Sequence, residues 1–285
     1  MHLAMILVVT FCAFGLRWSW STPTGTDFLT SWSQRWQRSL ILFLLPPLLA
    51  IATAISVILM GTQGQMIGLP AGWFSYAIAW GFLIYNFFLL VQLIVTGWRS
   101  LHKINTYAQV ELGGQSVRIL ELPTMFAAQI GFWQPQLVVS RGLLENLDAA
   151  HLKAVIQHEQ AHLHYRDTFW FFWLGCIRQV TFWLPNTQAI WEELLILREL
   201  RADRWAAQSV DTLLLAESIL WLVSDKTDST EIFSAALSRW TTRDRLEERI
   251  EALLNQPESP VQIPSWSFAW LFLAFLPLIS VYFHS

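Results

Sequence analysis

The sequence predicts an α+β fold in a polytopic helical membrane protein, with a charged domain inserted between the third and fourth transmembrane helices. Hydrophobic residues make up 54% of the 285-residue chain, which contains 17 Trp and 19 Phe but only 14% charged residues. This balance is typical of a membrane protein rather than a soluble enzyme. Residues 97–264 nevertheless hold 15 of the 18 Lys and Arg residues and 20 of the 21 Asp and Glu residues. The charged segment should therefore form a domain outside the bilayer.

Apolar runs that are candidates to cross a bilayer lie at both ends of the chain. Residues 1–96 contain three, at 3–16, 40–60 and 74–96, and residues 265–285 contain a fourth from Trp266 to Phe283. A helix needs about 20 apolar residues to cross a hydrocarbon core of about 30 Å. The first run is short, but no Lys or Arg precedes it, so it is expected to be a span rather than a cleaved signal peptide.

The Lys and Arg residues predict how these spans are oriented. The loop 17–39 contains three arginines, the loop 61–73 contains no charged residue, and Arg99 and Lys103 follow the third span. By the positive-inside rule, residues 17–39 and 97–264 are then cytoplasmic in a multi-pass protein of the cell membrane. The domain has more acidic than basic residues, so it offers no basic field for nucleic acid. The expected partners are the lipid bilayer and a protein substrate.

Two short strands and several helices are expected within residues 97–264. Val117–Glu121 and Gln136–Ser140 have strand character and are bounded by Gly and Pro residues. The helix that follows them is capped by Asp148 or Asn146, whose side chain accepts from its first N–H groups. Later helices are expected from their apolar periodicity at 190–207, 211–223 and 243–254.

The helix that follows the two strands contains the H-E-x-x-H motif as His158-Glu159-Gln160-Ala161-His162. On a helix the two histidines lie one turn apart on one face. Two neutral imidazoles in this position can bind one Zn²⁺ at about 2.0–2.1 Å, while Glu159 is held where it can take a proton from water. The alternative is a solvated helix that contains two histidines by chance. The motif alone therefore indicates, without establishing, metal-assisted peptide hydrolysis.

A third ligand is available in the segment Arg198-Glu199-Leu200-Arg201-Ala202-Asp203. Glu199 and Asp203 share one face of a helix, because they are four residues apart. Glu199 is the expected third ligand, and Asp203 is expected to accept the outer N–H of His158 and fix its tautomer. His164 is not expected to be a ligand, because it lies about 200° round the helix from His162. His151 lies almost two turns before His158, and a histidine in the first turn of a helix is more often a solvated or capping side chain than a ligand. The prediction is one catalytic zinc per chain with a fourth position left open.

The apolar run from Thr168 to Leu184 is long enough by hydropathy to suggest a fifth span. A single crossing there would place His158 and Glu199 on opposite sides of the membrane. Ligands of one ion must lie within a few ångströms of it. The run at 168–184 is therefore expected to be buried, re-entrant or interfacial.

With these two metal motifs, three spans before the domain and one after it, the chain resembles the BlaR/MecR family of membrane zinc metallopeptidases. Segments 136–144, 152–155 and 245–250 also look like positions of that family. The resemblance implies a gluzincin-like cytoplasmic domain that cleaves a repressor after an outside signal. It would give the ligand role to His158, His162 and Glu199 and the role of base to Glu159.

The sensors of that family continue past the fourth span into a penicillin-binding domain, whereas this sequence stops at Ser285. The signal is therefore expected to come through the spans themselves, through the lipid, or from a separate sensor protein. Two other functions remain open: a quality-control protease for membrane proteins, and a zinc-binding signalling or scaffold protein without turnover, against which Glu159 argues. Candidates for stabilising the oxyanion are Tyr165, Arg243 and Arg249. Leu137–Ser140 is the expected strand edge for an extended substrate.

Overall fold

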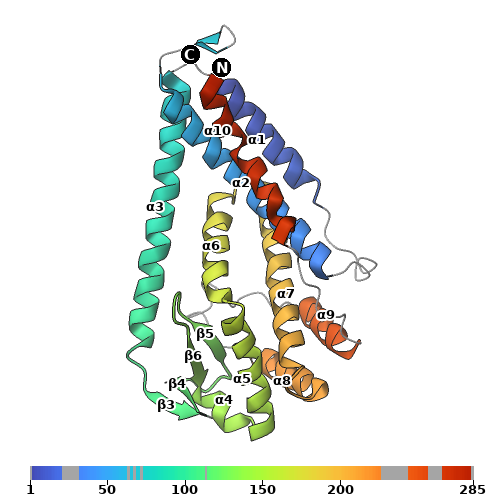
Figure 1. Cartoon of the computed structure of the whole chain (residues 1–285). Coiled ribbons are helices and arrows are strands. Elements are labelled where there is room, and N and C mark those ends of the chain that lie inside the picture. The colour runs from blue at the N-terminus through green and yellow to red at the C-terminus, as the bar shows by residue number, and fades with distance from the viewer. Residues whose placement is uncertain are drawn as a thin grey trace. The chain divides into compact units, whose positions relative to one another are not determined.

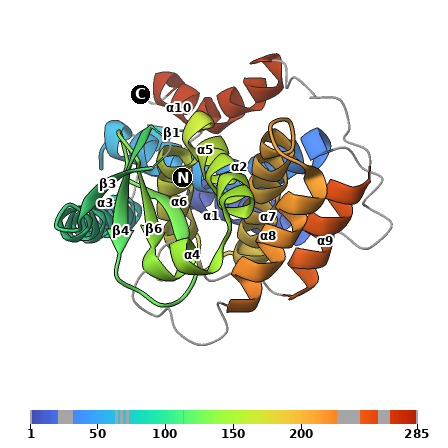
Figure 2. The same ribbon diagram turned by 90° about the horizontal axis from the view of Figure 1, so that it is seen from below.

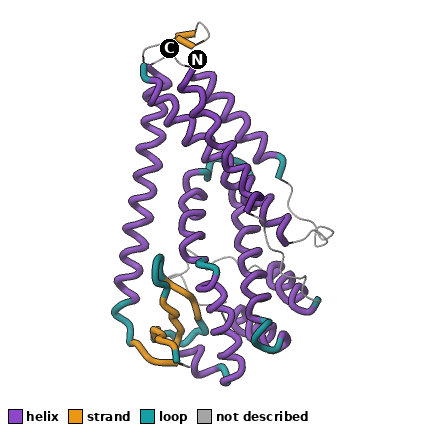
Figure 3. The backbone as a smooth tube through the Cα atoms, in the orientation of Figure 1, coloured by secondary structure: helices purple, strands orange, loops and turns teal. Residues whose placement is uncertain are grey.

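A computed structural model describes residues 2–20, 32–62, 65–66, 69–70, 73–112, 114–225, 243–255 and 265–283. The described chain is mostly helical, with a small sheet (Figures 1 and 3). It divides into two compact units, and each is described by itself. Unit 1 comprises Met1–Ile94, Gly175–Leu194 and Pro260–Ser285, and unit 2 comprises Val95–Leu174 and Leu195–Ser259. An α+β fold is therefore confirmed, whereas the number of membrane crossings stays a prediction.

Unit 1 is built from the apolar runs at the two ends of the chain. They form α1 (His2–Trp18), α2 (Trp32–Met60), most of α3 (Trp73–Ile104) and, after the domain, η2 (Ser265–Phe275), α10 (Leu276–Ile279) and η3 (Ser280–Phe283). Between α2 and α3, the short strands β1 (Gln65–Met66) and β2 (Leu69–Pro70) pair antiparallel. Ala54, Val57, Met60 and Ala79 form a buried cluster between α2 and α3. The last run is helical, but most of it winds as a 3₁₀ helix rather than as the regular α-helix expected of a span.

Two helices are long and apolar enough to cross a membrane, namely α2 and α3. Of the most apolar part of α2, 56% is buried within the protein, compared with 6% for α3. Length and composition alone are weak evidence, because the core helix of a soluble protein meets the same criteria. The pair indicates membrane association without fixing a topology.

Unit 2 contains a four-stranded sheet formed by β3 (Gln109–Leu112), β4 (Gln115–Leu120), β5 (Ala127–Ile130) and β6 (Gln136–Ser140). The strand order is β3-β4-β6-β5, with only the β4–β6 pair parallel. Buried Val117, Leu137 and Val139 form its core with Leu143 and Val155. The two strands expected from the sequence are present as β4 and β6, but β6 is an inner strand. The expectation that Leu137–Ser140 is a free edge is therefore wrong, and the edge on that side of the sheet is β5.

Helices pack on this sheet or on one another and carry the predicted motifs. They are α4 (Arg141–Asn146), α5 (Ala149–His164), the start of α6 (Asp167–Val180), the end of α7 (Thr187–Ala206), α8 (Thr212–Asp225) and α9 (Arg243–Leu254). Figure 2 shows α5 beside the sheet, with α8 next to it on the other side. Ala154 of α5 packs with Leu215 and Ile219 of α8 and with Leu246 and Leu253 of α9. The helix expected at 243–254 is thus present as α9, and its apolar side faces a core.

Candidate active site

Helix α5 begins where the sequence indicates and places the motif near its end. The Asp148 side chain accepts from the backbone N–H groups of Ala150 and His151, which satisfies two of the free donors at the helix start. His158, Glu159 and His162 follow on the buried part of the helix, each less than a tenth exposed. Asp148 is thus the cap, and the motif is helical as expected.

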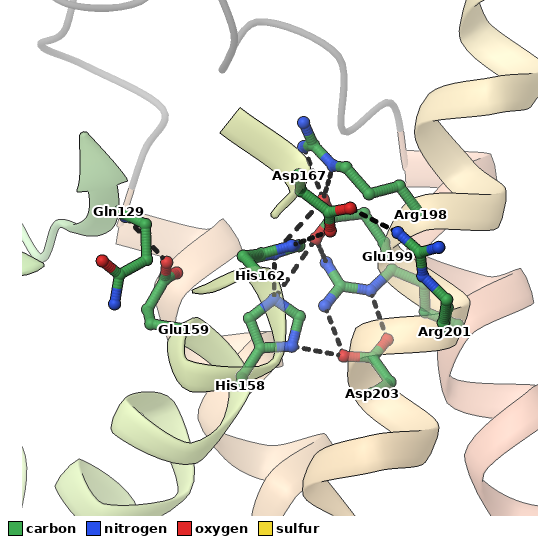
Figure 4. Close-up of polar contacts among 10 residues, drawn as sticks. Gln129, His158, Glu159, His162, Asp167, Arg198, Glu199, Arg201 and Asp203 are labelled. Atoms are coloured by element: carbon green, nitrogen blue, oxygen red, sulfur yellow. Dashed lines mark hydrogen bonds and ion pairs between the residues drawn. The ribbon is translucent and has the colours of Figure 1, made fainter. Parts of the chain in front are cut away.

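The inner nitrogens of the two histidines converge with the carboxylate of Glu199 from α7 (Figure 4). The Nε2 atoms of His158 and His162 are 3.2 Å apart, and Glu199 Oε2 lies 3.3 Å from the first while Glu199 Oε1 lies 3.8 Å from the second. Ligands of a tetrahedral ion bound at about 2.0–2.1 Å are separated by roughly 3.3 Å. The donor set and its spacing therefore fit one zinc ion. Ligand atoms of His158, Glu159 and His162 also lie within 4.8 Å of one another.

The outer nitrogen of each histidine faces a buried carboxylate. His158 Nδ1 lies 2.8 Å from Asp203 Oδ1, an ionic contact in which the ring N–H is poorly aligned. His162 Nδ1 is hydrogen-bonded to Asp167 Oδ2 at 2.8 Å. Such outer carboxylates orient a metal-binding imidazole and fix its tautomer. The structure thus brings Asp203 to the place that the sequence predicts, and adds Asp167, which the sequence reasoning missed.

Asp167 is the first residue of α6, five residues after His162, in a tight turn that contains Arg166 in a left-handed conformation with φ 53°. This turn directs the carboxylate back toward the imidazole. The only available signal was an acidic residue shortly after the motif, and its role depends on a backbone conformation that sequence spacing does not indicate. Arg201 of α7 also contacts Asp167.

Arginines surround the carboxylates of the site. Arg249 of α9 donates two hydrogen bonds to Asp203, at 2.7 and 2.8 Å, and its Nη1 lies 3.5 Å from Glu199 Oε2. Arg198 donates to Glu199 Oε1 from its Nη2 at 2.6 Å. Two bonds to one carboxylate fix the geometry as well as the charge. Arg249 is thereby engaged with Asp203, which is a positioning contact and differs from the oxyanion role expected as one alternative.

The buried charges change the protonation of the site. Burial alone would lower the pKa of His158, but the carboxylates of Asp203 and Glu199 outweigh it and raise that pKa to about 9. Burial raises the pKa of Glu199, but Arg198, His162, His158 and Arg249 together hold it well below its usual range. At neutral pH the metal-free site therefore contains a protonated His158 next to an ionised Glu199.

Glu159 points away from this cluster and toward the sheet (Figure 4). Its Oε2 accepts a hydrogen bond from the backbone N–H of Gln129 in β5, at 3.1 Å. That N–H therefore faces away from β6. Because backbone groups alternate in direction along a strand, the N–H and C=O groups of Ala127 face away from β6 as well. Within the described residues β5 pairs only with β6. The carboxylate thus lies between the histidines and a strand edge whose outward backbone groups face away from β6.

The other singled-out residues lie apart from this convergence. His151 contacts Asp148 and Glu217, and His164 is exposed and stacks on Trp205, so neither joins the two motif histidines. The ring of Tyr165 lies under the Arg201 guanidinium at 4.1 Å. The side chain of Arg243 lies outside the described residues.

Residues 104–224 match the family model described as Peptidase family M48. This segment contains the whole sheet, the H-E-x-x-H helix, Glu199 and Asp203. The match supports a peptidase of a zinc metallopeptidase family, since M48 peptidases in general depend on zinc. A comparison with curated proteins found no match. Helix α9 and Arg249 lie beyond the matched M48 segment.

Proposed function

We propose that the chain is a membrane-embedded zinc metalloendopeptidase, with one zinc per chain bound by His158, His162 and Glu199. The observation that carries the proposal is the convergence of these three side chains at the spacing of a tetrahedral ion, beside Glu159. Bound zinc supplies Lewis acidity for a water molecule and for the scissile carbonyl. A closed structural site is disfavoured because the set has three ligands, as catalytic zinc sites do.

Glu159 is the general base in this proposal. Its carboxylate takes a proton from the attacking water and delivers it to the amide nitrogen that leaves, which completes hydrolysis of the peptide bond. Asp203 and Asp167 hold the two imidazoles in one tautomer, with Nε2 directed inward. Arg249 keeps Asp203 ionised and fixed in place. In this proposal Glu159 transfers the proton, and the other residues hold the ligands in position.

An extended substrate is held along β5. The backbone groups of Ala127 and the C=O of Gln129 face away from β6 and can pair with a peptide that adds to the sheet as a further strand, while the Gln129 N–H donates to Glu159. The hydrogen bond from Gln129 to Glu159 places this edge directly beside the base. Main-chain pairing of this kind presents a backbone carbonyl to the site without requiring a particular sequence.

We infer that the substrate is a cytoplasmic regulatory protein, a repressor, cleaved in signal transduction. The likeness of the metal motifs and of the span pattern to the BlaR/MecR family supports this inference, and the apolar helices α2 and α3 support a location in the cell membrane. In this proposal the catalytic domain is cytoplasmic, and the signal reaches it through the spans, through the lipid or from a separate sensor protein.

Cellular N-terminal labelling tests this function directly. Cells that contain the wild-type chain are compared with cells that contain Glu159→Gln, which retains the zinc ligands and lacks the base. One or a few new termini in a transcriptional regulator are expected. Dozens of cuts across unrelated membrane proteins would instead identify a quality-control protease, and no difference between the two strains would leave a zinc-binding protein without turnover. Reporter fusions at 61–73 and within 97–225 test the two sides of the membrane independently.

A further inference from the structure

A cavity of about 260 Å³ lies in unit 2 at the end of α5. Its walls include Phe132, Trp133, Leu163, Arg166, Thr168 and Phe169. A water molecule occupies about 30 Å³ of liquid, and pockets for whole small molecules start at about 300 Å³. The cavity is therefore sized for one large side chain.

Each wall of the cavity continues directly from an element of the proposed site. The turn that contains Phe132 and Trp133 follows the end of β5, two residues after Ile130. Leu163 is next to His162 in the chain, and Thr168 is next to Asp167. The cavity is thus an extension of the site past the end of the strand edge.

The turn that forms one wall depends on a glycine. Gly131 has φ +143°, a conformation that favours glycine, and a Cβ atom there would lie 2.9 Å from Pro135 Cα. The tight turn brings the Phe132 ring to within 4.9 Å of Phe169 and 5.0 Å of Phe172, measured between ring centroids. The aromatic wall is thereby fixed by the backbone and by ring packing.

The apolar and charged groups of the cavity walls indicate which kind of side chain can bind there. Trp133 is 74% exposed although its ring packs edge-on against Phe132 and tilted against Phe169, so a large apolar surface is left uncovered next to the cavity. The buried Thr168 Oγ1 has no hydrogen-bond partner. Aromatic side chains at such sites gain much from covering apolar surface. An aromatic or large aliphatic side chain fits, whereas the nearby Arg166 disfavours a basic one.

The direction of the substrate follows from the edge strand. Antiparallel pairing is slightly more stable per residue than parallel pairing. A peptide antiparallel to β5 has its N-terminal part beside the C-terminal end of β5, which leads from Gln129 through Ile130 to the turn. Residues that precede the cleaved bond therefore run toward the cavity, and residues that follow it run away.

We propose that this cavity is a specificity pocket that receives an aromatic or large aliphatic side chain on the N-terminal side of the cleaved bond. The inference rests on the proposed peptidase function and adds the substrate class to it. The pocket would select among peptides that the strand edge alone accepts without regard to sequence.

Cleavage profiling of a proteome-derived peptide mixture tests the pocket. The full chain is purified in detergent micelles, loaded with zinc, and its cuts are read by mass spectrometry against Glu159→Gln. At one position before the cut, Phe, Tyr, Trp, Leu and Met should exceed Gly by roughly 10- to 100-fold in relative cleavage rate, as expected of an apolar pocket. A comparable preference only after the cut would overturn the proposal.

A substitution that fills the cavity should reverse this preference. Leu163→Trp is expected to move the preferred residue at that position to Ala or Ser while zinc content stays at one per chain. Leu213→Trp is the matched control, because Leu213 is 65% exposed on α8 and does not line the cavity. An unchanged profile in folded, zinc-loaded Leu163→Trp overturns the pocket and leaves the peptidase function standing.

Photo-crosslinking gives a readout that does not depend on turnover. Peptides with p-benzoylphenylalanine at the selected position are bound to the Glu159→Gln chain and irradiated. Crosslinks are expected within residues 132–135 or 163–169, and crosslinks confined to other segments contradict the pocket. If the wild-type chain cuts no peptide that Glu159→Gln leaves intact, the proposed function fails and this inference falls with it.

Discussion

The two ends of helix α5 each hold histidine next to carboxylates, yet only the C-terminal end brings the Nε2 atoms of two histidines together, 3.2 Å apart. At the start, His151 lies 2.8 Å from Asp148 and 3.3 Å from Glu217, and the exposures of these two carboxylate side chains are 66% and 52%. At the end, the side chains of Asp203 and Asp167, which face His158 and His162, are 2% and 3% exposed. The carboxylates therefore differ greatly in exposure, whereas the side chains of the three histidines are all 11% exposed.

The two ends also differ in where the ring nitrogens of their histidines point. At the end of α5 both histidines turn Nδ1 to a carboxylate and Nε2 to a shared point that Glu199 also reaches. His151 has no such second histidine, and both of its nitrogens face carboxylates, while its ring stacks on Trp221 at 4.4 Å. A histidine beside acidic residues thus indicates a metal ligand only where the Nε2 atom of a second histidine is directed to the same point.

The largest expected effect comes from removing one inner nitrogen. His158→Ala should bind no zinc at stoichiometric metal and should lose all Glu159-dependent cleavage, because two ligands cannot replace the three required. Elemental analysis of the purified chain measures the zinc directly. Full occupancy in this variant would show that zinc does not need the Nε2 atom of His158.

Glu159→Gln tests proton transfer separately from zinc binding. The amide keeps the size of the side chain and its acceptor for Gln129 N–H but cannot take a proton. Cleavage should fall by roughly 100- to 10,000-fold, the usual contribution of a general base, with zinc content unchanged. Retained cleavage would move the role of base to another residue.

The sequence predicted which side chains converge because helical spacing is local. His158 and His162 share a face by their separation, and the same rule pairs Glu199 with Asp203. The contacts that depend on long-range packing were not predictable: Arg249 reaches Asp203 across 46 residues, and Asp167 depends on a left-handed turn. The edge strand was misassigned because β5 contains Ala127 and Ala128, which lack strand character, and pairing order is not encoded in any one strand.

Asp167 and Asp203 should have intermediate and similar effects. Asp167→Asn or Asp203→Asn should weaken zinc affinity or activity by roughly 10- to 100-fold, because each leaves an imidazole without its charged orienting partner. Asp211→Asn is a matched control, since Asp211 caps α8 and Asn caps a helix equally well. A chelator competition measures the affinities. Equal affinity in all three variants would remove the orienting role.

The raised pKa of His158 predicts how zinc binding depends on pH. Below about pH 9 the metal-free ring is protonated, and it must lose that proton to bind zinc, so affinity should fall about tenfold for each pH unit below this value. The same shift stabilises the metal-free fold fully below about pH 6.5, the ordinary pKa of histidine, and this stabilisation is lost as the pH rises toward 9. Chelator competition at pH 7, 8 and 9 measures the slope. A flat profile would mean that His158 is already neutral.

The smallest effect is expected at the other end of the helix. His151→Phe keeps a ring to stack on Trp221 and removes both nitrogens, so zinc content and cleavage should match the wild type. Its carboxylate partners are exposed, and ion pairs of exposed groups contribute little to stability. The melting temperature should therefore change by no more than about 2 °C. A loss of zinc in this variant, with the fold intact by circular dichroism, would show that the start of α5 takes part in the metal site, and the contrast between its two ends would no longer hold.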